Sequence, residues 1–171
     1  MNPERLLFFL LFAFAIATGC DKDQPAATPP PPKRLPTIEM TIADTPFRIE
    51  LAVTLAARTQ GLMHRTVEPD EGMLFIFPHD RIRQFWMKNC IVGLDMLFLE
   101  RDGTIINIET LPPPKPGEEP AIGRSTRPAR YVLELPAGRA KELGLEPDRR
   151  IDLPPAVYNI LPEPETPLSL W

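Results

Sequence analysis

The stretch LDMLFLERDGTIINIETL, residues 94–111, decides the fold of this chain. Its first six residues are apolar except for Asp95, as expected of a strand that is covered on both faces of a sheet. Asp102-Gly103 is a residue pair that adopts positive φ readily and so favours a tight turn. Residues 94–99 and 104–111 are therefore predicted to form a β-hairpin.

Further strands are predicted on both sides of this hairpin. Residues 37–42 and 47–51 alternate between apolar and polar side chains and flank a turn, which indicates a second hairpin. The remaining strands are expected in the apolar run 73–77, the alternating segment 131–135 and residues 149–153.

Two short helices complete the predicted fold. Thr54 can cap a helix that extends to Met63, and a second helix after residue 135 ends at Leu143, where Gly144 provides a left-handed cap. Five prolines within residues 112–120 make a stiff loop that cannot lie in a sheet interior. We expect a mainly β (α+β) single domain with about seven strands, two short helices and a compact curled or barrel-like sheet.

The first residues of the chain have the organisation of a lipoprotein export signal. The apolar run 6–17 would span about 18 Å as a helix, well short of the ~30 Å hydrocarbon core of a bilayer. Ala17-Thr18-Gly19-Cys20 resembles the lipobox of bacterial lipoproteins, in which the cysteine is acylated and the bond before it is cut. We expect a signal peptide at 1–19 and lipidation of Cys20, with simple secretion and an uncleaved anchor as the alternatives.

Composition divides the rest of the chain into three parts. Residues 20–36 form a proline-rich linker, residues 37–153 the globular domain, and residues 154–171 a proline-rich tail that either docks on the domain or trails free. Asp21, directly after Cys20, resembles the inner-membrane retention signal of enteric bacteria. The expected location is the periplasmic side of the cell envelope, lipid-anchored, with the inner membrane slightly favoured.

The charge pattern argues against nucleic acid as a partner. The net charge is −4, and no block of Lys or Arg marks a surface for a polyanion. Arg124 and Arg127, which flank Ser125, are either solvated loop residues or a grip for an anion. Once Cys20 carries lipid, Cys90 is the only thiol left, so no intramolecular disulfide can form and Cys90 is expected to be buried and inert.

Five segments occur in an order that resembles one protein family. They are RTQGLM at 58–63, GMLFIF at 72–77, FWMKN at 85–89, LDMLFL at 94–99 and ARYVLE at 129–134. This order resembles the uncharacterised prokaryotic family named domain of unknown function 192, over residues 46–152. The resemblance implies a compact β-rich fold and an envelope or extracytoplasmic association, and it implies no established reaction. Cys90 stands where members often carry Thr, and Pro114 where they often carry Cys, so no thiol role is carried over.

Asp95 is the polar residue that most needs a partner, because desolvating an isolated carboxylate among apolar neighbours is costly. Lys88 and Arg83 are nearby in sequence, so one interpretation is a structural ion pair. The other is a cleft for a small polar or anionic ligand, formed by Arg83, Trp86, Lys88, Asn89 and Asp95. Glu109 is either a surface charge at a strand end or a second carboxylate facing Lys88 or Asp95.

No further group of residues indicates catalysis. His64, His79 and one thiol cannot supply the ligands of a structural zinc site, and no glycine-rich phosphate loop or nucleophile elbow is present. Neither a metal nor a cofactor is therefore expected. The leading hypothesis is a lipid-anchored envelope module that binds a partner protein or a small polar ligand without turnover. The alternatives are a structural role and an envelope enzyme that uses Lys88 and Asp95, with Glu109 as a further catalytic candidate.

Overall fold

The computed structural model describes residues 35–165 of the 171-residue chain, so the predicted signal peptide, the lipidation of Cys20 and most of the linker lie outside the described residues. None of the helices in this range has the length and apolar character that a membrane span requires. The described elements are β1 (Thr37–Ile42), β2 (Thr45–Ala52), α1 (Leu55–Gln60), β3 (Glu71–Arg81), β4 (Gln84–Trp86), β5 (Leu94–Leu99), β6 (Ile105–Leu111), β7 (Ile122–Arg124), β8 (Ala129–Pro136), α2 (Arg139–Glu142) and α3 (Pro155–Tyr158).

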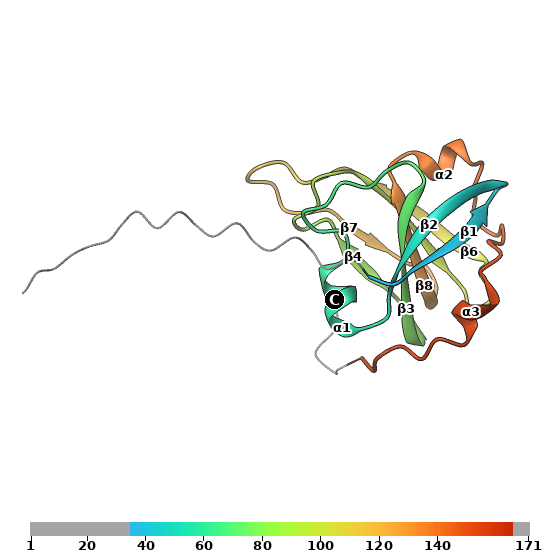
Figure 1. The fold of residues 1–171 in the computed structure, drawn as a ribbon. Coiled ribbons are helices and arrows are strands. Elements are labelled where there is room, and N and C mark those ends of the chain that lie inside the picture. Colours follow the sequence, from blue (N-terminus) through green and yellow to red (C-terminus); the bar gives the residue numbers. More distant parts are fainter. Residues whose placement is uncertain (1–34, 166–171) are drawn as a thin grey trace, which may run out of the picture. The chain divides into compact units, whose positions relative to one another are not determined.

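Six of these strands form one mixed sheet in the order β1-β2-β3-β8-β5-β6 (Figure 1). β2 and β3 are parallel and are connected through α1, whereas the other neighbouring pairs are antiparallel. Residues 72–77 of β3 and all of β5 are buried. The prediction that residues 73–77 and 94–99 are interior strands is therefore confirmed.

The alternation of side chains along the strands divides the core into two layers. One layer, called here the α2 side, contains Leu97 and Leu133 of the central strands together with Ala140 of α2. The other layer, the α1 side, contains Phe98 of β5 together with Ala57 of α1. Neighbouring residues of one strand therefore face different surroundings.

The edge strands curl around the α2 side. Ile42 of β1 and Ile105 of β6 belong to the same buried cluster, although their strands stand at opposite ends of the sheet order. The prediction of a mainly β single domain with a curled sheet is confirmed.

The two predicted helices are present but shorter than expected. The Thr54 hydroxyl accepts the Ala57 N–H at 3.1 Å, which caps α1 as predicted, and α1 ends at Gln60 rather than at Met63. A third helix, α3, lies in the tail and was not predicted. It has a proline in its first turn, where the missing N–H has no cost.

Residues 149–153 do not form the predicted last strand. They are joined to the β5–β6 hairpin by a single bridge between Thr104 and Arg150. Gly103 of the hairpin turn has φ +92°, and a Cβ added there would lie 2.2 Å from the Ile151 carbonyl oxygen. The segment therefore packs against the turn itself instead of extending a ladder beside β6.

A small antiparallel sheet of β4 and β7 was not predicted. Strands of three residues are too short for alternation to reveal them. The small sheet covers the α1 side, where the rings of Phe85 and Phe75 pack at right angles with a centroid distance of 4.8 Å.

The described part of the tail docks on the domain, which was one of the two predicted alternatives. Val157 of α3 is 1% exposed and belongs to the α2-side core. Residues 159–165 then run along the lower end of the domain in Figure 1, from α3 toward α1. The Glu163 N–H donates to the Val53 carbonyl oxygen at 2.9 Å, which holds the tail against the end of β2.

Candidate functional site

A pocket of about 490 Å³ lies where α1, the end of β3 and the small sheet meet. Its volume falls within the roughly 300–1,000 Å³ that small-molecule sites occupy. The charged lining consists mainly of Arg58, Arg81, Arg83 and Arg124. The apolar lining consists of Leu55, Phe77, Ile82, Phe85, Trp86 and Ile122.

Arg83 provides a buried positive charge in this pocket. Its side chain is 7% exposed, and its guanidinium carbon lies 3.7 Å from the centroid of the Phe77 ring. Nε donates to the Ala129 carbonyl oxygen at 3.3 Å, and the terminal nitrogens bind the His79 carbonyl and the Glu165 carboxylate. Burial lowers the pKa of Arg83, and the Glu165 carboxylate opposes that shift. A guanidinium does not give up its proton in a protein, so Arg83 needs an anion beside it.

Arg58 and Arg81 also approach this ion pair. Arg58 donates to the Val53 carbonyl oxygen at 2.8 Å, and burial lowers its pKa, with the charge of Glu165 opposing the shift. Nε of Arg81, whose side chain is half exposed, lies 4.0 Å from Oε2 of Glu165. Positive charge from α1 and from the end of β3 is therefore concentrated around one carboxylate.

Apolar side chains that remain open to solvent form another part of the pocket wall. Ile82, Trp86 and Ile122 are 42%, 43% and 61% exposed, and Trp86 pairs with Ile122 across the small sheet. Lys88 Nζ lies 4.6 Å from the centroid of the Trp86 ring. The pocket therefore offers uncovered apolar surface next to positive charge.

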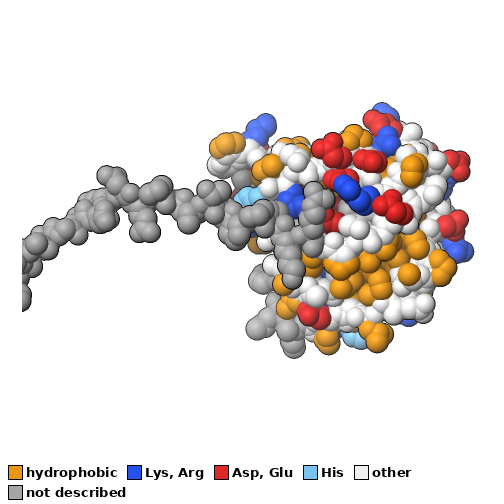
Figure 2. Space-filling view, viewed as in Figure 1, with side chains coloured by type: hydrophobic (Ala, Val, Ile, Leu, Met, Phe, Trp, Pro, Cys, Tyr) orange, Lys and Arg blue, Asp and Glu red, His pale blue; other side chains and the backbone are white. Residues whose placement is uncertain are grey.

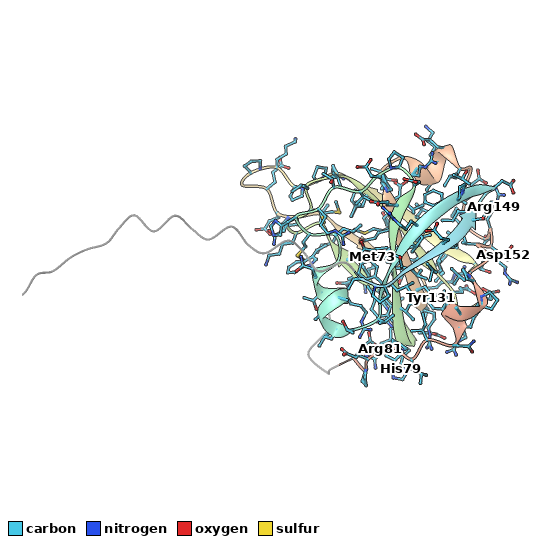
Figure 3. All side chains as sticks on the ribbon, in the orientation of Figure 1. Met73, His79, Arg81, Tyr131, Arg149 and Asp152 are labelled. Carbon is cyan, nitrogen blue, oxygen red and sulfur yellow. The ribbon has the colours of Figure 1, made fainter. Side chains whose placement is uncertain are left out.

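The charge in this pocket differs from that of the face in view in Figure 2. On the face in view in Figure 2, acidic and basic side chains are intermixed, and apolar side chains gather below them. Figure 3 places His79 and Arg81 together at the lower end of β3, with Met73 farther along the sheet. β3 thus carries Arg81 to the same end of the domain that the tail crosses.

The predicted ion pair of Asp95 with Lys88 or Arg83 is not formed within residues 35–165. The Asp95 side chain is fully buried, and Oδ2 accepts the Ala140 N–H at 2.7 Å. Oδ1 accepts the Thr110 hydroxyl at 2.7 Å and the Gly138 N–H at 3.0 Å. The carboxylate therefore holds the start of α2 against β5 and β6.

The reason for this correction is the alternation along β5. Asp95 shares its face with Leu97, which lies on the α2 side. Met87 lies on the α1 side, so Lys88 and Arg83 belong to the segment that covers the opposite face of the sheet. Of the residues predicted to form a cleft, Arg83 and Trp86 line the pocket, whereas Asp95 does not.

Asn89 and Glu109 also lie outside the pocket lining. Asn89 is exposed at φ +58°, and its Nδ2 lies 3.8 Å from Sδ of Met63. Glu109 is half-buried on β6 and accepts a hydrogen bond from Asn107 Nδ2 at 3.2 Å. Glu109 makes no ion pair with Lys88 among the residues that the structure describes.

Two titratable groups are buried on the α1 side. Cys90 is 8% exposed, and burial raises the pKa of its thiol to about 11, which confirms the prediction of a buried thiol and keeps it protonated. Glu134 is 4% exposed, and burial raises its pKa to about 8. The alternating pattern of residues 131–135 did not indicate the burial of Glu134, because β8 is covered on both faces.

Sequence reasoning did not identify Arg58, Arg81 or Glu165 as site residues. Glu165 lies 82 residues from Arg83, and no local pattern connects the two. Of the two arginines considered as an anion grip, Arg124 lines the pocket. Arg127 does not line it and instead pairs with Glu100 at 3.2 Å and Asp148 at 3.5 Å.

Comparisons with known proteins place the fold in a family. Residues 38–153 match the family DUF192, described as Uncharacterized ACR. A crystal structure from Sinorhizobium meliloti 1021, described as a candidate transcription regulator, is 42% identical with a TM-score of 0.57, and the match covers 66% of this chain and 88% of that one. A protein of unknown function from Novosphingobium aromaticivorans DSM 12444 is 31% identical with a TM-score of 0.62, over 70% of this chain and 86% of that one. No curated protein matches the chain. The chain belongs to the DUF192 family.

Proposed function

We propose that this protein is a lipid-anchored cell-envelope module, attached through Cys20, that binds a small anionic ligand without turning it over. The observation that carries the proposal is the pocket of about 490 Å³ lined by four arginines and exposed apolar surface. The chain has a net charge of −4, so this concentration of positive charge in one concavity does not follow from its composition.

The ligand is expected to combine an anionic group with an apolar part. A guanidinium presents a planar set of donors that suits carboxylates and other oxyanions. Trp86 and Ile122 supply apolar surface that no described part of the chain covers fully. A ligand that filled both parts of the pocket would gain from charge pairing and from apolar burial.

The lining favours binding over acid–base catalysis. Arginine does not exchange its proton near neutral pH, and it supplies most of the charge of the pocket. The enzyme alternative requires Lys88 and Asp95 to lie together. Lys88 instead lies over the Trp86 ring, and hydrogen-bond donors enclose Asp95 on the other side of the sheet, so the two do not meet among the described residues. The Sinorhizobium protein is described as a transcription regulator. We do not propose that role for this chain, because nucleic-acid binding uses an extended basic surface and the sequence has no block of Lys or Arg.

Ligand binding can be tested with 3-phenylpropionate and its neutral amide, 3-phenylpropionamide, as probes for the full chain. We expect saturable shifts of the backbone amide NMR signals of Gln84 and Ile122 with the carboxylate and much weaker shifts with the amide. Arg124→Gln should weaken carboxylate binding several-fold, because it removes a charge from the lining. Arg127→Gln is the matched control, since Arg127 pairs with Glu100 away from the pocket. Equal binding of both probes, or equal effects of the two variants, would contradict the proposal.

The anchor can be tested by expressing the full chain in bacteria and separating membranes from soluble proteins. The wild-type protein is expected in the membrane fraction with acyl chains on Cys20, and Cys20→Ala is expected in the soluble fraction. Cys90→Ala is the control, because it removes the other cysteine and should leave the protein with the membranes. A wild-type protein that remains soluble and keeps Met1 would refute anchoring.

A further inference from the structure

The pocket is partly filled by the tail of the chain itself. The Glu165 carboxylate enters the pocket, where its side chain is 7% exposed, and Oε1 binds Nη1 of Arg83. Glu165 lies beyond residue 153, where the match to the family ends, whereas Arg58, Arg81 and Arg83 lie within it. The domain thus supplies the positive site, and the appended tail supplies the anion.

Glu165 occupies this site imperfectly. Only Oε1 is hydrogen-bonded, and Oε2 is buried without a hydrogen-bond partner among the described residues. Nε of Arg81 lies 4.0 Å from Oε2, which is beyond hydrogen-bonding distance. A free carboxylate, which has no chain to restrict its orientation, can place both oxygens against donors.

The tail is also held weakly on its way to the pocket. Leu161 is 94% exposed, so the segment that follows Ile160 gains little from apolar burial. Its contacts are polar and lie near the surface: Glu163 Oε2 accepts the Leu55 N–H at 2.7 Å, and the Glu163 carbonyl accepts Arg58 Nη2 at 2.9 Å. A segment held by a few exposed hydrogen bonds opens at low cost.

We infer that the ligand of this pocket is a small carboxylate with an apolar group, and that Glu165 is a tethered competitor that this ligand displaces. The inference rests on the proposed ligand-binding function and adds the chemical class of the ligand and its regulation. When a competitor occupies the site about nine-tenths of the time, the apparent affinity for a free ligand is about tenfold lower.

The test compares full chains that carry Trp171→Phe, which leaves Trp86 as the only tryptophan and therefore as a fluorescent reporter in the pocket wall. Glu165→Gln removes the tethered carboxylate, and it is expected to lower the dissociation constant for 3-phenylpropionate about tenfold. Binding of 3-phenylpropionamide should not change. Glu163→Gln is the matched control, because it makes the same charge change two residues away and its side-chain oxygen can still accept the Leu55 N–H.

Thermal unfolding of the same chains provides a second measurement. Without Glu165, Arg83 keeps its backbone contacts but lacks a carboxylate, so 3-phenylpropionate should raise the Tm of Glu165→Gln more than that of Glu163→Gln. If the two variants bind the carboxylate equally, Glu165 does not compete with the ligand, and the proposed function is unaffected. Equal affinity for the carboxylate and the amide would overturn the ligand class and, with it, the proposed binding of an anionic ligand. No binding by any chain would overturn the inference and the proposed function together.

Discussion

The Asp95→Asn variant is expected to lose about 2–4 kcal/mol of the free energy of unfolding. The Asp95 carboxylate is fully buried, and donors surround it: the Thr110 hydroxyl and the N–H groups of Gly138 and Ala140. An asparagine amide has one oxygen to accept these bonds and an NH2 group that must face a donor. At least one of these donors is then left without an acceptor beside a side chain that is fully buried.

Urea denaturation of the full chain measures this loss as a lower midpoint with an unchanged slope. Asp102→Asn is the control, because Asp102 is exposed in the β5–β6 turn and its side chain accepts the Thr104 N–H at 3.0 Å. An exposed hydrogen bond of this kind contributes about 1 kcal/mol or less. If Asp95→Asn is no more destabilising than Asp102→Asn, the carboxylate does not hold the start of α2 as described.

The sequence predicted only part of the environment of the Asp95 carboxylate. The apolar surroundings of Asp95 within residues 94–99 showed that it needs partners. They did not show which partners, because the donors at Gly138 and Ala140 are more than 40 residues away and meet Asp95 only after β8 pairs with β5. Alternation alone places Asp95 with Leu97, and proximity in sequence to Lys88 misled the prediction.

The pocket shows a second limit of sequence reasoning. Arg83 and Trp86 could be named because Trp86 belongs to the motif at residues 85–89 and Arg83 lies just before it. Arg58 belongs to another motif, and Glu165 lies in a proline-rich tail with no regular pattern. These residues meet because α1 covers the same face as the small sheet and because the tail runs toward α1 (Figure 1). Such an arrangement depends on long-range packing, which periodicity does not contain.

The largest pH effect is expected from Glu134. Burial raises the pKa of this carboxyl from its usual 4.5 to about 8, so the folded chain keeps a proton that the unfolded chain releases. Between about pH 4.5 and about pH 8 the folded state therefore binds more protons, and the free energy of unfolding falls as the pH rises. The decrease across this window is expected to be about 2–5 kcal/mol, since one pKa unit corresponds to about 1.4 kcal/mol.

Glu134→Gln keeps the shape of the side chain and removes its titration, so most of this pH dependence should disappear. Near pH 5 the variant and the wild type should unfold with free energies within about 1 kcal/mol, and at pH 8 the variant should be the more stable protein. Cys90, the thiol whose pKa is raised in part by Glu134, stays protonated through this range because its pKa is about 11. Glu39→Gln, an exposed change on β1, is the control for the loss of one negative charge, and it should keep the wild-type pH dependence. Urea denaturation at pH 5 and pH 8 decides between the outcomes. A Glu134→Gln chain with the wild-type slope would mean that the Glu134 carboxyl ionises freely in the folded state.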